Sequence, residues 1–245
     1  MLPTLRQLFF IGTVLAGALV YARGPESGGG GGVVFVNEKP QLVDFFTIPG
    51  SAEILAQKYF EKQPSRLDRN IIFNIEYKTI PDNVAFMNVL FVFKKWSDLA
   101  YDAIGMDINS SIYAPVRWNL TDQPITPAVY YRPPGLPSEL QIKPAAYYLM
   151  KDEVYEVSLS RQIWNKLSLQ DQTGLLIHET LRHIQIGRSY SFDDEALQKA
   201  TAVMLTCKPS ITLDQYLFFL LHNRRDIAEK NFDTFGILTK DCGKN

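Results

Sequence analysis

The chain has no excess of basic residues and no long basic run. Its 245 residues include 25 lysines and arginines against 26 aspartates and glutamates, so the formal net charge is −1. Its basic runs go no further than pairs such as Lys94-Lys95 and Arg224-Arg225. A protein that holds DNA or RNA through phosphate contacts usually has a clear basic excess. The composition therefore argues against a nucleic-acid partner, and it identifies no other partner.

Cysteine is scarce, with only Cys207 and Cys242 in the chain and no C-x-x-C spacing. This excludes the common redox motif and weighs against a cysteine metal site. In an oxidising compartment an even pair most simply forms one disulfide. On the chain-entropy model, closing a loop of about 35 residues would stabilise the fold by roughly 3 to 4 kcal/mol. Two unrelated buried thiols are the alternative.

The chain also lacks the G-x-S-x-G motif of serine hydrolases. Its five consecutive glycines, residues 28–32, are not followed by the Gly-Lys-Ser/Thr of a phosphate-binding loop and precede a strand pattern. We expect residues 23–32 to form a flexible leader. No internal repeat or interdomain linker is visible after it.

One mostly apolar run, residues 8–22, lies near the N-terminus between Arg6 and Arg23. It ends in Val20-Tyr21-Ala22, with small residues where signal peptidase requires them. About fifteen residues fall short of the ~20 that span a bilayer. We expect residues 1–22 to be a secretory signal peptide and the protein to be exported, to the periplasm or outside the cell, with no membrane span after cleavage. Cleavage removes Arg6, so the 25 basic and 26 acidic side chains become 24 and 26.

Hydrophobic periodicity predicts a mixture of strands and helices. The predicted strands are an N-terminal hairpin, 33–36 and 41–46, followed by 70–79, 116–120 and 152–160. The predicted helices are 51–62, 82–104, 168–186, 191–208 and 213–223. We expect residues 33–245 to form a single α+β domain, with a modest antiparallel sheet packed against at least four helices.

The segment His178-Glu179-Thr180-Leu181-Arg182-His183 nearly spells the H-E-x-x-H zinc motif, with Arg182 where the second histidine belongs. In that motif the histidines lie four apart, about 40° around the helix axis, and reach one metal while the glutamate activates a water. His178 and His183 lie five apart, about 140° around the axis. A regular helix therefore points their rings in different directions.

The ionisable residues of this helix share an arc that also contains Leu175 and Ile186. Because the arc is not purely polar, we expect some of these groups to be partly buried. Buried charges need partners. Glu179 can supply them, since it reaches Arg182 at i+3 and His183 at i+4.

The strand, the H-E helix and the acidic helix after it, residues 152–206, resemble the core of zincin-type metallopeptidases. The resemblance implies that His178 is a first zinc ligand and Glu179 a general base. The departure is Arg182, whose permanent charge would repel a cation. The chain is also similar to uncharacterised exported bacterial proteins with a glycine-run leader, an early hairpin and a late L-H-E-x-L-R-H helix. Residues 28–32 and 177–183 carry that similarity, which implies no known activity.

The leading hypothesis is a non-catalytic exported domain, envelope-associated or released. In it Glu179, Arg182 and His183 form a structural polar cluster, with Glu195 as a further candidate, and no metal or other cofactor is expected.

A metal-dependent hydrolase is the alternative. It would need a helical bulge that brings His178 and His183 together, or a zinc site built from Glu179, His183 and either Glu195 or Asp194. A third hypothesis is a metal-free hydrolase with His178 or His183 as general base.

Overall fold

The computed structural model describes eight parts of the chain. They are residues 31–48, 75–76, seven positions between 85 and 96 (85, 88, 89, 92, 93, 95 and 96), 116–125, 130–151, 154–187, 194–222 with 224–232, and 242. The predicted signal peptide 1–22, the first eight leader residues and the predicted helix 51–62 lie outside these residues.

The N-terminal hairpin forms as predicted, but its second arm is shorter. Strand β1 (Gly32–Val36) pairs antiparallel with β2 (Lys39–Leu42), and the short β5 (Lys143–Pro144) pairs with the other edge of β1. Residues predicted to continue the second arm form a 3₁₀ helix instead, η1 (Val43–Phe46). The backbone N–H of Leu42, the last residue of β2, donates to the Asp171 carboxylate. This bond holds the end of the strand against helix α6 (Leu169–Gly187), where the chain leaves the sheet.

A second sheet has the order β3-β4-β7-β6. Its strands are β3 (Ile75–Glu76), β4 (Val116–Thr121), β6 (Ala146–Lys151) and β7 (Val154–Ser160). The pairs β3–β4 and β4–β7 are parallel, whereas β6–β7 is antiparallel. The α+β class is therefore confirmed, but the prediction of one antiparallel sheet is wrong. The reason is that the segment from 122 to 153 is long enough to return the chain for a parallel pairing.

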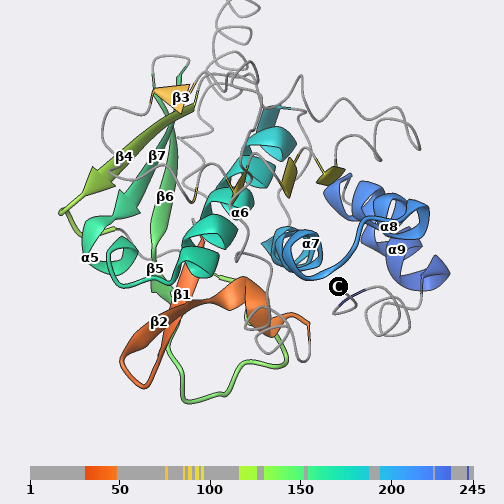
Figure 1. Ribbon diagram of the computed structural model, residues 1–245, viewed down its shortest axis with the longest axis horizontal. Helices are drawn as coiled ribbons and strands as arrows, with labels where there is room; N and C mark the ends of the chain where they lie inside the picture. Colours follow the sequence, from red (N-terminus) through yellow and green to blue (C-terminus); the bar gives the residue numbers. More distant parts are fainter. Residues whose placement is uncertain are drawn as a thin grey trace, which may run out of the picture.

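The prediction of at least four helices is also confirmed. The described helices are α5 (Arg161–Trp164), α6 (Leu169–Gly187), α7 (Asp194–Thr206), α8 (Ile211–Leu221) and α9 (Arg225–Asn231). Figure 1 shows α6 between the four-stranded sheet and α7, with the hairpin beside one end of α6 and α8 and α9 beyond α7. Helix α6 is thus covered on several sides, as predicted from the apolar residues that lie among its ionisable ones.

Helix α6 starts at a capping box, as its sequence predicts. The Ser168 hydroxyl accepts the backbone N–H of Asp171 at 3.2 Å, and the Asp171 carboxylate accepts hydrogen bonds from Ser168. The helix then packs tightly on the hairpin, because a Cβ built on Gly174 would lie 2.7 Å from the side chain of Leu42. Only a residue without a side chain allows this approach.

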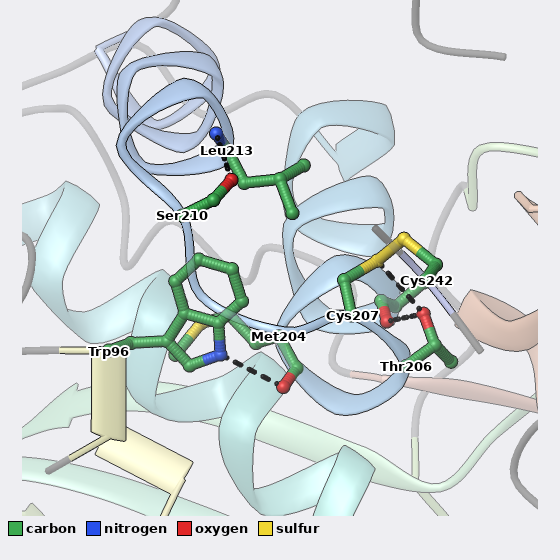
Figure 2. Close-up of a disulfide and its surroundings, with 8 residues drawn as sticks. Trp96, Met204, Thr206, Cys207, Ser210, Leu213 and Cys242 are labelled. Atoms are coloured by element: carbon green, nitrogen blue, oxygen red, sulfur yellow. Dashed lines mark hydrogen bonds between the residues drawn. A yellow bond between two sulfur atoms is a disulfide. The ribbon is translucent and has the colours of Figure 1, made fainter. Parts of the chain in front are cut away.

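The described positions of the predicted helix 82–104 are helical, and most are buried. Ala85, Val89, Val92, Phe93 and Trp96 belong to the hydrophobic core. The Trp96 indole N–H donates to the Met204 carbonyl at 3.0 Å, as Figure 2 shows. Core packing therefore accounts for this large apolar segment.

Cys207 and Cys242 form the predicted disulfide, and their backbones also make an isolated antiparallel bridge. Figure 2 shows the bond at the end of α7. It fixes residue 242 against the buried end of that helix. Within the described residues, no helix has the length and apolar character needed to cross a membrane.

Candidate functional site

The four ionisable residues of the motif on helix α6 are buried. His178, Glu179, Arg182 and His183 are each exposed by 2% or less. A charge removed from water needs a partner at close range. Besides contacts within α6, each of these side chains has a partner in another segment, so each ties α6 to another part of the fold.

His178 faces η1. Its Nδ1 atom lies 2.7 Å from Oδ2 of Asp44, a residue with no exposed surface. Burial alone would lower the pKa of His178, but the charge and hydrogen bond of Asp44 outweigh it, so the pKa lies above its ordinary value. At a pH equal to the ordinary histidine pKa, His178 is therefore mainly in the protonated, imidazolium form.

Arg182 lies beside the other edge of the same ring. Its Nη2 atom is 3.4 Å from His178 Nε2 and 3.4 Å from Oδ1 of Asp194, the first residue of α7. Asp194 Oδ1 is 4.0 Å from the same His178 nitrogen. Asp194 thus faces both cations. Burial raises the pKa of Asp194, while His178 and Arg182 act in the opposite direction.

The second carboxylate oxygen of Asp194 joins α7 to the loop before β5. It accepts the backbone N–H of Tyr131 at 2.8 Å and the side-chain amide of Gln198 at 3.2 Å. The same amide group also donates to the Tyr131 carbonyl. These bonds hold Asp194 in position against Arg182.

Glu179 links α6 to the start of the hairpin. Its Oε1 atom accepts the backbone N–H of Gly31, and its Oε2 atom lies 3.9 Å from Arg182 Nη1. A Cβ built on Gly31 would lie 2.2 Å from the Leu175 side chain. The prediction that the leader extends to residue 32 is therefore wrong at its end. Gly31 is buried and donates its backbone N–H to Glu179, and Gly32 begins β1.

His183 lies apart from these contacts. Its Nδ1 atom is 3.0 Å from the Tyr148 hydroxyl on β6, and burial lowers the pKa of His183 to about 4. The two rings of the motif therefore engage η1 and β6, as their five-residue spacing predicts. The structure does not place His183 with the charged side chains around Arg182.

Glu195, the further candidate for the cluster, has different partners. Its carboxylate pairs with Arg225 of α9 and with Lys199 one turn along α7, at 2.9 Å. It joins two helices near the surface instead of contacting Arg182. The neighbouring residue Asp194 faces Arg182 instead, at 3.4 Å.

The central charged cluster, as we call it, therefore consists of Asp44, His178, Glu179, Arg182 and Asp194. Sequence reasoning identified the three residues on α6 and missed Asp44 as a partner. The available signal was a lone acid inside the apolar run Leu42-Val43-Asp44-Phe45-Phe46, since a buried acid requires a cation. It also missed Tyr148, whose position on β6 depends on a strand that was not predicted.

In the described residues, no three histidine, cysteine, aspartate or glutamate side chains gather so as to hold a metal ion. Helix α6 is α-helical from Leu169 to Gly187, so the bulge that would bring His178 and His183 together does not form. No protein-family model, curated protein or solved structure matches this chain.

Proposed function

We propose that this protein is a non-catalytic exported domain, envelope-associated or released, whose H-E-x-x-R-H helix has a structural role. The observation that carries the proposal is the burial of His178, Glu179, Arg182 and His183 together with their use as contacts to other elements. A hydrolytic group must reach its substrate. Here His178 Nδ1 faces Asp44, Glu179 Oε1 accepts the Gly31 N–H and His183 Nδ1 lies beside the Tyr148 hydroxyl.

The central charged cluster supports a structural role through its connections. Asp44 brings η1 to α6, Gly31 brings the start of the hairpin, and Asp194 brings α7. Removing one member of a buried ion cluster leaves another charge without compensation, which typically costs about 3 to 5 kcal/mol. The contacts of α6 with η1, with the start of the hairpin and with α7 therefore depend on one another through the cluster.

Export is supported by two features of the chain. The apolar run at residues 8–22 has the form of a signal peptide. The Cys207–Cys242 disulfide is of the kind that persists in oxidising compartments.

The test compares Glu179→Gln with the wild-type protein. The glutamine keeps an oxygen for the Gly31 N–H but removes the charge beside Arg182, so the free energy of unfolding should fall by about 3 kcal/mol. Denaturant titration measures this fall, and a peptide and ester panel measures hydrolysis. Gln170→Glu, a charge change at the start of α6, serves as the matched control and should change stability by less than about 0.5 kcal/mol.

Purified mature wild-type protein should contain no stoichiometric zinc by elemental analysis. One tightly held metal per chain would overturn the proposal. So would hydrolysis that disappears in a folded Glu179→Gln variant. Hydrolysis that survives a chelator and is lost in His183→Ala would support the metal-free hydrolase instead.

A further inference from the structure

A pocket of about 420 Å³ opens between the hairpin and the start of α6, separate from the central charged cluster. Its walls come from β2, from η1 and from the loop between α5 and α6. The lining residues are Lys39, Pro40, Gln41, Phe45, Lys166, Leu167, Ser168, Gln170 and Asp171. The volume lies in the range of small-molecule sites.

Two lysines give this pocket its charge. Lys39 on β2 and Lys166 in the α5–α6 loop come from opposite sides of it, and both are exposed. Among the described residues, neither ammonium group forms an ion pair or hydrogen bond, whereas Lys199 is paired with Glu195 and Glu229. Two ammonium groups at one pocket attract an anion.

The one acidic residue that lines the pocket, Asp171, is already engaged in hydrogen bonds within the fold. Asp171 is 7% exposed, and both of its oxygens face inward. Oδ1 accepts the Leu42 N–H at 2.8 Å, and Oδ2 accepts the Ser168 hydroxyl. Its hydrogen-bonding capacity is used within the fold, so it holds the hairpin on α6 and presents no acceptor to a bound cation.

Half of the remaining lining residues are apolar. Pro40, Phe45 and Leu167 are buried side chains that border the same space. A ligand that places an apolar body on these residues and a negative group between the two ammonium groups would match both features of the pocket. Inorganic phosphate would match only the charge.

We propose that this pocket binds a small organic anion, in which a carboxylate or phosphate group is attached to a short apolar body. The inference stands apart from the proposed function, since the pocket shares no residue with the central charged cluster. Zinc analysis and hydrolysis assays test that function, and anion titration tests this site.

The experiment is a titration of ¹⁵N-labelled mature protein with benzoate and with phenyl phosphate, followed by amide chemical shifts. Benzyl alcohol and benzylamine are the neutral and cationic controls, and inorganic phosphate is the anion without an apolar body. We expect saturable shifts in residues 39–45 and 166–171 with at least one of the two aromatic anions. The binding should weaken as ionic strength rises.

The double variant Lys39→Gln/Lys166→Gln should weaken the binding at least about tenfold. Lys230→Gln, which removes an exposed lysine on α9, should leave the affinity unchanged. The proposal is overturned by any of four results: equal binding of the neutral or cationic analogue, equal binding of inorganic phosphate, undiminished affinity in the double variant, or no saturable shift at these residues.

Discussion

Arg182 shows how one side chain sets the chemistry of the motif helix. A histidine there would lie one turn from His178, where both rings could share a metal. The arginine instead places its guanidinium 3.4 Å from both His178 Nε2 and Asp194 Oδ1. A guanidinium stays charged in proteins and has no lone pair for a metal. The helix therefore carries an ion cluster where the H-E-x-x-H motif would place its second histidine.

Another buried acid, Asp214 on α8, predicts a dependence of stability on pH. It is 1% exposed, its carboxylate oxygens have no hydrogen-bond partner in the part of the chain that the structure describes, and burial raises its pKa to about 7. Between pH 3.8 and about 7 the folded protein holds a proton that the unfolded chain has released. The contribution of Asp214 to stability therefore falls as pH rises through this window, and it is constant above it.

Asp214→Asn should abolish this fall. At pH 8 the variant should be more stable than the wild type by about 1 to 3 kcal/mol, because the wild-type carboxylate is charged and unsatisfied there. Well below pH 3.8 the two proteins should be equally stable, since the aspartate is then protonated in both the folded and the unfolded state. Urea titrations at several pH values measure the difference, and a constant difference across the range would contradict the assignment.

His183 should titrate far below an ordinary histidine. Burial lowers its pKa to about 4, so between about 6.5 and 4 the unfolded chain binds a proton that the folded protein rejects. The stability that His183 contributes is present above pH 6.5 and is lost as pH falls toward 4. NMR of the ring protons measures the titration, with His183→Gln assigning the signal. A midpoint near 6.5 would contradict the buried position beside Tyr148.

At the level of elements, two hydrogen bonds join α6 to the hairpin segment, one near the start of the helix and one further along it. Asp171 accepts the Leu42 N–H near the start of the helix, and two turns later Glu179 accepts the Gly31 N–H. Between them, Gly174 lets Leu42 approach the helix backbone. The hairpin register and the helix position are therefore fixed together. A slip of β1 would separate Glu179 from the Gly31 N–H, and a slip of β2 would separate Asp171 from the Leu42 N–H.

The hairpin turn itself offers a stabilising substitution. Asn37 and Glu38 both have positive φ, 49° and 68°. Asparagine tolerates this region, whereas glutamate does not favour it. Glu38→Gly should raise the free energy of unfolding by about 0.5 to 1 kcal/mol, since relief of strain exceeds the added entropy of the unfolded chain. Denaturant midpoints measure the change. Asn37→Gly should gain less, and a lower midpoint for Glu38→Gly would contradict the strain.

At the scale of the molecule, long-range contacts join the described N-terminal and C-terminal segments to one core. The hairpin at residues 32–42 packs on α6, α6 packs on α7, and α7 ends at the disulfide that fixes Cys242. Helix α7 therefore lies between both ends of the described fold, and its residues from Ala196 to Thr206 are nearly all buried.

Loss of the disulfide should release residue 242 from α7. The double variant Cys207→Ala/Cys242→Ala should lower the free energy of unfolding by roughly 3 to 4 kcal/mol, because the unfolded chain regains the freedom of a loop of about 35 residues. Guanidinium titration measures the loss, and Cys242→Ala alone should lose a similar amount. Equal stability of wild type and double variant, or free thiols in the native protein by mass spectrometry, would contradict the bond.

The sequence by itself determined the local features of this protein. The capping box at Ser168 and Asp171, the extent of α6 and the strand at 116–120 all follow from interactions within a few residues, and these were confirmed. The divergence of His178 and His183 also follows from helix geometry alone. Each of these features depends on backbone periodicity or on a side chain reaching its own neighbours.

Tertiary structure decided which charges meet. Asp44 lies 134 residues from His178 in the chain, and Gly31 lies 148 residues from Glu179, so no local pattern could pair them. The parallel pairing of β4 with β7 depends equally on a long connection. Burial is the physical reason for the selection: once α6 is enclosed, each buried charge is stable only where another element supplies its counter-charge or donor.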